Sequence, residues 1–158
     1  MGILTDDMKR VVTEQRLGFV ATVCPDGTPN LSPKGTTAVY DDDHLVFVDI
    51  RSPGTVANLR ANPAVEINVV DQFARKGYRF KGRAEVVDPG PRFEQLLGAY
   101  ESRETMLAGA GQRARAVVLV EVERTAPLMS PAYDWVDSEE ELRAHWRRYF
   151  EQLESARA

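Results

Sequence analysis

The stretch "NLSPKGTTAVY", residues 30–40, decides the fold prediction, because it reads as a β-strand that is interrupted in its middle. Pro33 cannot donate a hydrogen bond to a neighbouring strand, so the strand must bulge there or run along a sheet edge. Gly35 leaves room for a backbone or a ligand to approach closely. Lys34 between them would then be aimed by a distorted backbone, an arrangement that can bind an anion. The alternative is a plain edge bulge that carries a solvated lysine.

Six β-strands are predicted, four of them early in the chain. They cover residues 17–24, 30–40, 45–50, 64–71, 76–88 and 113–129. Early strands joined by short turns must pair antiparallel, and closure of the sheet into a barrel removes its exposed edges. The predicted fold is therefore α+β and mainly β, a single domain over residues 1–158 in which helices pack outside a small antiparallel barrel. A ferredoxin-like sandwich is the alternative.

Four helices are expected around this barrel, at about residues 4–16, 52–62, 91–107 and 138–156. Ser52 is placed to cap the second helix, with Pro53 in its first turn. Ser138 and Glu141 form a capping box at the start of the C-terminal helix. An apolar stripe that includes Trp146 runs along this last helix and indicates a packing face, on the barrel or on a partner.

The composition is ordinary for a globular domain, with 158 residues of which 43% are hydrophobic and 28% charged. A net charge of −4 does not favour nucleic acid or an anionic membrane. No apolar run is long enough to span a bilayer and the N-terminus lacks an apolar signal core, so we expect a cytoplasmic protein. Cys24 is expected to be a buried structural thiol. His44 and His145 lack metal-binding spacings, so no metal site is expected.

A second feature supports an anion site. The third predicted strand leads directly into "DIRSPGT", residues 49–55, where a helix begins. A helix N-terminus offers free N–H groups and the positive end of the helix dipole. The second and third strands are joined by a short turn and are therefore predicted to be neighbours. Lys34 and Ser52 would then converge on one phosphate, with Arg51 and Thr55 beside it.

These residues resemble the pyridoxamine 5′-phosphate oxidase-like family of FMN-binding split β-barrels. The resemblance is carried by "GFVATVCPDGTPNLSPKG", "LVFVDIRSPGTVANLRANPAVEINVVD" and "KGYRFKGRAEVV", and it covers residues 17–87. The "PDGTP" turn and the "NLRANP" segment before a strand are its most specific pieces. The resemblance implies a six-stranded split barrel with flanking helices, a homodimer, and FMN bound at the subunit interface.

The resemblance also implies which positions bind the cofactor. Lys34 takes the role of the basic residue that holds the phosphate from the second strand. Val48, Asp49 and Ile50 match the strand end that lines the isoalloxazine ring, and the strand–helix junction follows them. The complete set of implied positions is Lys34, Gly35, Thr36, Val48, Asp49, Ile50, Arg51, Ser52 and Thr55.

We therefore expect an FMN-binding oxidoreductase that acts on an unknown small molecule, with the flavin carrying out the hydride chemistry. The basic, histidine-containing substrate motif of the vitamin-B6 oxidases is absent near the C-terminus, so oxidation of pyridoxamine phosphate is not implied. No catalytic residue is assigned. Tyr133 and Asp134 lie in a loop that would either cover a flavin or anchor the C-terminal helix.

Two rival functions stay open. Some members of the wider family use the deazaflavin F420, and arginine outnumbers lysine 16 to 4 here, a bias common in high-GC bacteria, some of which make F420. The other rival is a non-catalytic flavin-binding or stress-related dimer, or a barrel that has lost its cofactor. It is favoured by "PGT" at residues 53–55, where many relatives carry a basic residue or two.

Overall fold

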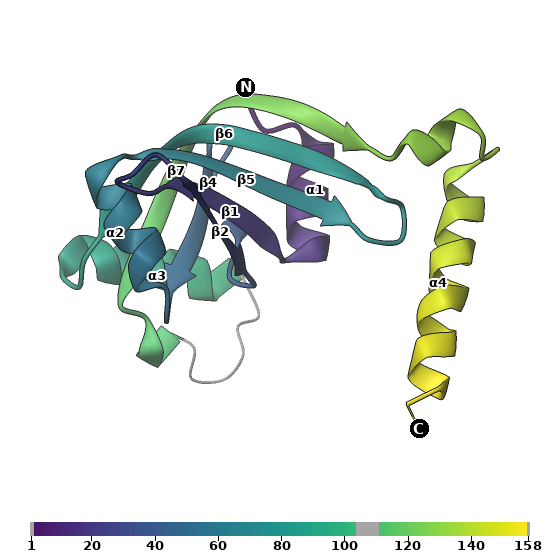
Figure 1. Cartoon of the computed structure of the whole chain (residues 1–158). Helices are drawn as coiled ribbons and strands as arrows, with labels where there is room; N and C mark the ends of the chain where they lie inside the picture. The colour runs from purple at the N-terminus through teal and green to yellow at the C-terminus, as the bar shows by residue number, and fades with distance from the viewer. Residues whose placement is uncertain (1, 104–110, 158) are drawn as a thin grey trace.

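A seven-stranded antiparallel sheet forms the body of the protein, in the order β2-β1-β5-β6-β7-β4-β3. The protein is described by a computed structural model over residues 2–103 and 111–157. Figure 1 shows the sheet curling into a barrel that is flanked by helices, which confirms the predicted fold class. The strands are β1 (Gly18–Val23), β2 (Pro29–Lys34), β3 (Ala38–Val39), β4 (His44–Asp49), β5 (Ala64–Asp71), β6 (Lys76–Val87) and β7 (Ala116–Met129).

The interruption in residues 30–40 is the point where the chain crosses from one edge of the sheet to the other. β2 ends at Lys34 and pairs with β1, whereas β3 begins at Ala38 and pairs with β4. The predicted single strand is therefore two strands, and the sheet has seven strands instead of six. The edge position expected from Pro33 is confirmed. The second predicted strand is expected to pair with the third, which is β4. Its later part, β3, does pair with β4, whereas its earlier part, β2, does not, because the turn after Lys34 redirects the chain.

Four helices flank the sheet, as predicted. They are α1 (Asp6–Gln15), α2 (Pro53–Ala61), α3 (Pro91–Arg103) and α4 (Glu139–Ser155), with two short 3-10 helices, η1 (Gly111–Arg113) and η2 (Pro131–Asp134). Ser138 Oγ accepts a hydrogen bond from the Glu141 N–H at 3.1 Å, as expected of a helix cap. The Glu141 carboxylate accepts from the Asp137 N–H, one position before the predicted partner. The predicted continuation of α3 over residues 104–107 lies outside the described residues.

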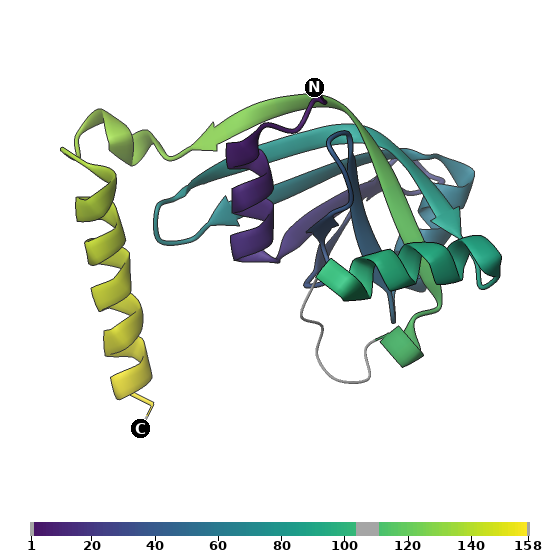
Figure 2. The same cartoon turned by 180° about the vertical axis from the view of Figure 1, so that it is seen from behind.

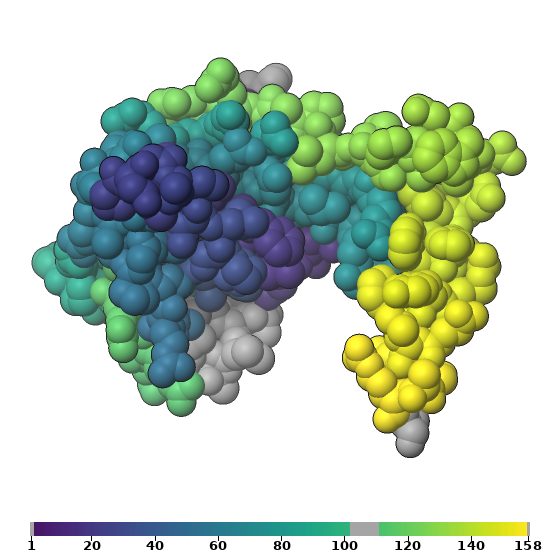
Figure 3. Space-filling model, in the orientation of Figure 1, coloured from purple at the N-terminus to yellow at the C-terminus, as the bar shows by residue number. Residues whose placement is uncertain are grey.

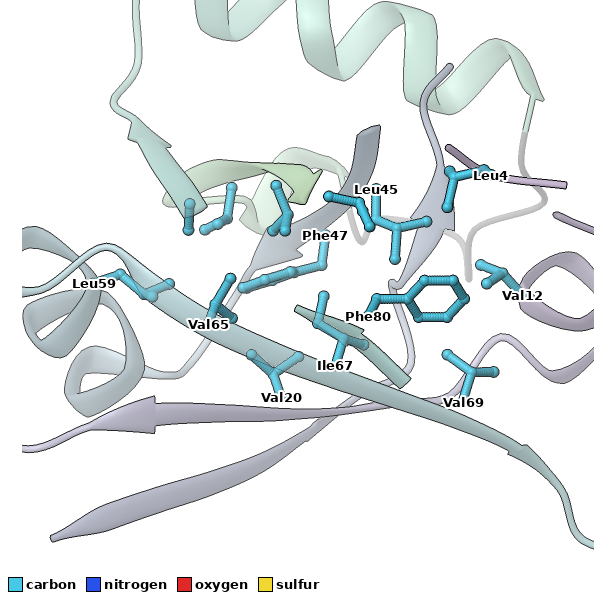
Figure 4. Close-up of a cluster of buried hydrophobic side chains, with 14 of the residues drawn as sticks. Leu4, Val12, Val20, Leu45, Phe47, Leu59, Val65, Ile67, Val69 and Phe80 are labelled. Carbon is cyan, nitrogen blue, oxygen red and sulfur yellow. The ribbon is translucent and has the colours of Figure 1, made fainter. Parts of the chain in front are cut away.

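Apolar side chains from both halves of the sheet fill the barrel (Figure 4). Phe47 and Phe80 are fully buried at its centre, and α1 covers this cluster through Val12. A second cluster packs α3 onto β4 and β7, and Figure 2 shows α1 and α3 lying over the sheet from behind. These two clusters hold the end of β4 rigidly, and the candidate site begins there.

The C-terminal helix α4 stands off from the barrel (Figure 3). It is attached through the loop between β5 and β6, where Arg143 pairs with Asp71 at 2.6 Å and the Phe73 and Phe150 rings lie 5.8 Å apart. Leu142 is the buried residue of this helix. The predicted apolar stripe therefore contacts the hairpin over part of its length. No helix in residues 2–103 or 111–157 is long and apolar enough to cross a membrane.

Candidate anion and cofactor site

β2 carries its polar side chains inward and its apolar side chains outward. Asn30, Ser32 and Lys34 lie on the more buried face of the strand, and Lys34 is only 6% exposed. Leu31 and Pro33 point to the outer side, where Leu31 is 65% exposed. This is the reverse of the usual pattern for a strand with one face on the core. The polar inner face of β2 therefore needs polar partners, and its apolar outer face lacks cover from the described residues.

The buried Lys34 ammonium is held by two serine hydroxyls. Lys34 Nζ donates to Ser32 Oγ at 2.5 Å and also donates to Ser52 Oγ. Burial lowers the pKa of Lys34 below its ordinary value, and the nearby Asp49 carboxylate partly opposes this shift. The predicted convergence of Lys34 and Ser52 is thus present. β2 and β4 are not paired with each other. The two side chains meet because the curl of the sheet brings the end of the edge strand β2 next to the start of α2.

Ser52 occupies the N-cap position of α2, but its side chain makes no capping hydrogen bond. The predicted side-chain cap is wrong, because Lys34 Nζ donates to the hydroxyl instead. The first helical hydrogen bond runs from the Val56 N–H to the Ser52 carbonyl at 3.1 Å. The N–H groups of Gly54 and Thr55 come before this bond and donate to no backbone carbonyl of the described residues. The start of α2 therefore keeps two N–H groups beside a buried ammonium, which is an arrangement that binds anions.

Two threonines fix the chain crossing on which Lys34 sits. Thr36 Oγ1 donates to the Val48 carbonyl and accepts from the Val48 N–H, both at 3.0 Å. Thr37 Oγ1 donates to the Lys34 carbonyl at 2.9 Å. The Thr36 hydroxyl is therefore already occupied. Around Gly35, by contrast, no described atom lies within 4 Å of where a Cβ would stand, so a ligand can approach.

Asp49 leaves a buried acceptor without a donor. Its side chain is 4% exposed, and Oδ1 has no hydrogen-bond partner within the described chain. Such an orphaned carboxylate oxygen is costly unless a ligand or partner supplies a donor. A flavin nucleotide fits both halves of the site. Its phosphate suits Lys34 and the free N–H groups of Gly54 and Thr55, which we call the phosphate cradle, and its hydroxyl or ring N–H groups suit Asp49. The negative charge of Asp49 also weakens the attraction of this cradle for a phosphate dianion.

The other predicted positions divide into buried and accessible ones. Val48 is 2% exposed and belongs to the cluster under α3, and the Thr55 side chain is 3% exposed. Both side chains are turned away from solvent, so at Thr55 only the backbone N–H group is available to a ligand. Ile50 is partly buried and Arg51 is exposed, at the rim of the site.

Sequence reasoning missed three residues that belong to this end of the barrel. Ser32 holds Lys34, and its position two residues earlier on the same face of a strand was the available signal. Arg113 and Arg115 line a cleft with Ile50 and Arg51. Nothing in the alternating "RAR" of residues 113–115 indicated this neighbour, because β7 reaches β4 only through the sheet pairing.

The loop with Tyr133 anchors the C-terminal arm. Tyr133 Oη donates to the Ala74 carbonyl at 2.7 Å, and η2 lies beside α4, at the end of the molecule away from α2 (Figure 1). Within one chain this supports the anchoring role of Tyr133. Cys24 is partly buried, with Asn58 Nδ2 3.5 Å from its sulfur. Residues 2–103 and 111–157 contain no group of three metal-ligating side chains.

The sequence profile described as pyridoxamine 5′-phosphate oxidase matches residues 4–128. Among solved structures, HupZ of Group A Streptococcus is 31% identical with a TM-score of 0.68, and the match covers 81% of this chain and 96% of that one. An F420 reductase is 24% identical with a TM-score of 0.57 and coverages of 77% and 98%. No curated protein matches the chain significantly.

An FMN-binding protein from Syntrophomonas wolfei is 13% identical with a TM-score of 0.57, and the match covers 79% of this chain and 91% of that one. At 13% identity, and likewise at the 24% identity of the F420 reductase, the likeness shows the fold alone. The profile match spans most of the chain and agrees with the HupZ relationship and the observed barrel. The chain therefore belongs to the pyridoxamine 5′-phosphate oxidase-like family of FMN-binding split barrels.

Proposed function

We propose that the protein is an FMN-binding oxidoreductase that acts on a small molecule in the cytoplasm. The observation that carries this proposal is the buried Lys34 ammonium, hydrogen-bonded to Ser52 at the start of α2. Lys34 is 6% exposed and its hydrogen bonds go only to hydroxyl groups, so the nearby Asp49 carboxylate offsets its charge without bonding to it, and the cofactor phosphate would supply a directly bonded anion. Bound FMN would supply the hydride chemistry, while this chain binds and orients it.

Each residue of the cradle has a role in this proposal. Lys34 and the Gly54 and Thr55 N–H groups hold the phosphate, and Arg51 adds a cation at the rim. Asp49 accepts a hydrogen bond from the sugar alcohol or the ring. The open space at Gly35, where no described residue apart from its chain neighbours has an atom within 4 Å of the place that a Cβ would take, lets the cofactor approach the backbone.

A homodimer is part of the proposal. The outer face of β1 and β2 presents apolar side chains that the described residues of this chain leave uncovered, including Phe19 at 38% and Leu31 at 65% exposure. β2 is also an edge strand, and an apolar edge invites a second chain. Because Lys34 ends this edge strand, a partner that also covers the free edge of β2 would lie near the proposed cofactor site.

F420 is the second candidate cofactor. It is supported by the fold likeness to an F420 reductase and by the absence of basic residues at Pro53 and Gly54. The reduced positive charge at the helix start favours a ligand that depends less on a phosphate dianion at this place.

Titration of FMN and of F420 into the purified protein, followed by fluorescence, tests the proposal. We expect saturable binding of FMN at one site per chain and a yellow colour of the loaded protein. Binding of F420 with little binding of FMN would favour the second candidate. Binding of neither would contradict both and favour a barrel without a cofactor.

A further inference from the structure

A cleft at the end of β4 gathers three arginine side chains. Its volume is about 520 Å³, and it is lined by Ile50, Arg51, Arg113 and Arg115. Neither Lys34 nor Ser52 lines it, whereas Arg51, the cation at the rim of the phosphate cradle, does, so the cleft adjoins the cradle. We call this concavity the arginine cleft.

None of the three guanidinium groups has a carboxylate partner among the described residues. Elsewhere in the chain Arg60, Arg92 and Arg143 form ion pairs of 2.6 to 2.8 Å. Acids are abundant, because 24 Asp and Glu residues outnumber 20 Lys and Arg residues. Three like charges that line one cleft repel one another unless an anion lies between them. The arginine cleft therefore has the charge of an anion-binding site.

The backbone that carries these arginines is fixed by sheet pairing. Asp49 at the end of β4 pairs with Ala116 at the start of β7. The Arg115 N–H donates to the Asp49 carbonyl at 2.8 Å, which extends this ladder by one hydrogen bond. Arg51 and Arg115 thus stand near the ends of two paired strands. Guanidinium groups gathered at one place suit carboxylates and phosphates, because each guanidinium can donate two parallel hydrogen bonds.

We propose that the arginine cleft binds the substrate of the protein, a small molecule that carries two or more carboxylate or phosphate groups. This inference rests on the proposed function in one respect, that the neighbouring cradle holds the flavin. The cleft adjoins the cradle through Arg51 and Ser52, so an anion held by Arg113 and Arg115 would place the rest of the molecule towards the cofactor. The cleft gives the substrate class that the sequence alone left unknown.

Calorimetric titration of citrate and of pyrophosphate at low ionic strength tests the cleft. The test variant is the double substitution Arg113→Gln and Arg115→Gln. The matched control is Arg147→Gln with Arg148→Gln, which removes the same charge from exposed positions on α4. We expect the test variant to lose about tenfold or more in affinity for at least one probe, the loss of charge-assisted hydrogen bonds, while the control changes by less than about twofold. The probe with the larger loss tells whether carboxylate or phosphate is preferred.

FMN affinity separates the failure of this inference from the failure of the proposed function. We expect the Arg113→Gln, Arg115→Gln variant to bind FMN within about twofold of the wild type, since its cradle is intact. Loss of FMN binding in this variant would overturn the inference, because the cleft would then belong to the flavin site. Absence of binding of both probes, or equal losses in test and control variants, would overturn it as well. A wild type that binds a probe through Arg113 and Arg115 but never binds FMN would contradict the proposed function alone.

Discussion

The side chains of Lys34 and Ser52 meet through a hydrogen bond, although 18 positions separate them in the sequence. Lys34 ends the edge strand β2, and Ser52 is the N-cap residue of α2. The bond therefore joins the two parts of the chain that the curled sheet brings together. It also diverts the Ser52 hydroxyl from the helix cap that its position would otherwise favour.

Ser52→Ala should destabilise the protein through Lys34, because no side-chain cap is lost. Removal of one acceptor from a buried ammonium costs about 1–3 kcal/mol of unfolding free energy. Urea unfolding of the wild type, Ser52→Ala, Lys34→Met and the double variant completes a double-mutant cycle, which shows whether this cost arises through Lys34. We expect the cost of Ser52→Ala to vanish in the Lys34→Met background. A cost that persists there would mean that Ser52 stabilises α2 directly.

Gly54→Lys should tighten FMN binding by about tenfold, or about 1.4 kcal/mol. Gly54 is exposed, and outside its neighbours in the chain and helix no described atom lies within 4 Å of its Cβ position, so a Cβ can be added there without a clash. The added cation increases the positive charge at the phosphate site, which the carboxylate of Asp49 partly cancels. Thr55 could not accept the same substitution, because its side chain is buried. Gly54→Ala is the control, and equal FMN affinities of the two variants would place the phosphate away from α2.

FMN affinity should fall with rising pH before an exposed lysine would titrate. Burial holds the pKa of Lys34 below its ordinary value of 10.5, so the ammonium deprotonates earlier in the alkaline range. Between the two pKa values the unfolded chain binds more protons than the folded one, so the Lys34 contribution to stability rises with pH there. FMN titrations and urea unfolding of wild type and Lys34→Met from pH 7 to the alkaline range measure both trends. An affinity that does not change with pH would contradict the role of Lys34.

The apolar outer face of β2 should hold the proposed dimer together. Leu31→Glu introduces a charge on this face, where the wild-type side chain is 65% exposed, and should convert the dimer into monomers without unfolding. Met129→Glu is a matched control, since Met129 is 62% exposed and lies at the end of β7. Light scattering gives the mass of each variant. A wild type with the mass of one chain at high concentration would contradict the dimer.

Local patterns in the sequence predicted most of the fold. The capping box at the start of α4 and the proline signal for an edge strand act between residues that are close along the chain, so they can be recognised without the structure. The division of residues 30–40 into β2 and β3 could not be recognised in this way. It depends on pairing with β1 and β4, which lie in opposite halves of the strand order.

The candidate site was predictable in part for the same reason. Lys34 and Ser52 were found because each lies next to a feature with a local signature, a proline in a strand and a helix start. The orphaned Oδ1 of Asp49 and the arginine cleft were not found, because both depend on the pairing of β4 with β7. Nothing in the sequence between Arg51 and Arg113 links these two positions.

Riboflavin, which lacks the phosphate of FMN, gives the sharpest test of whether Lys34 binds that phosphate. Fluorescence titration of both ligands into the wild type and into Lys34→Met gives four affinities. We expect the wild type to prefer FMN by about tenfold to a hundredfold, the worth of a charge-assisted hydrogen bond. Lys34→Met should lose this preference, while riboflavin binds both proteins equally. An undiminished preference for FMN in Lys34→Met would contradict the assignment of Lys34 to the phosphate.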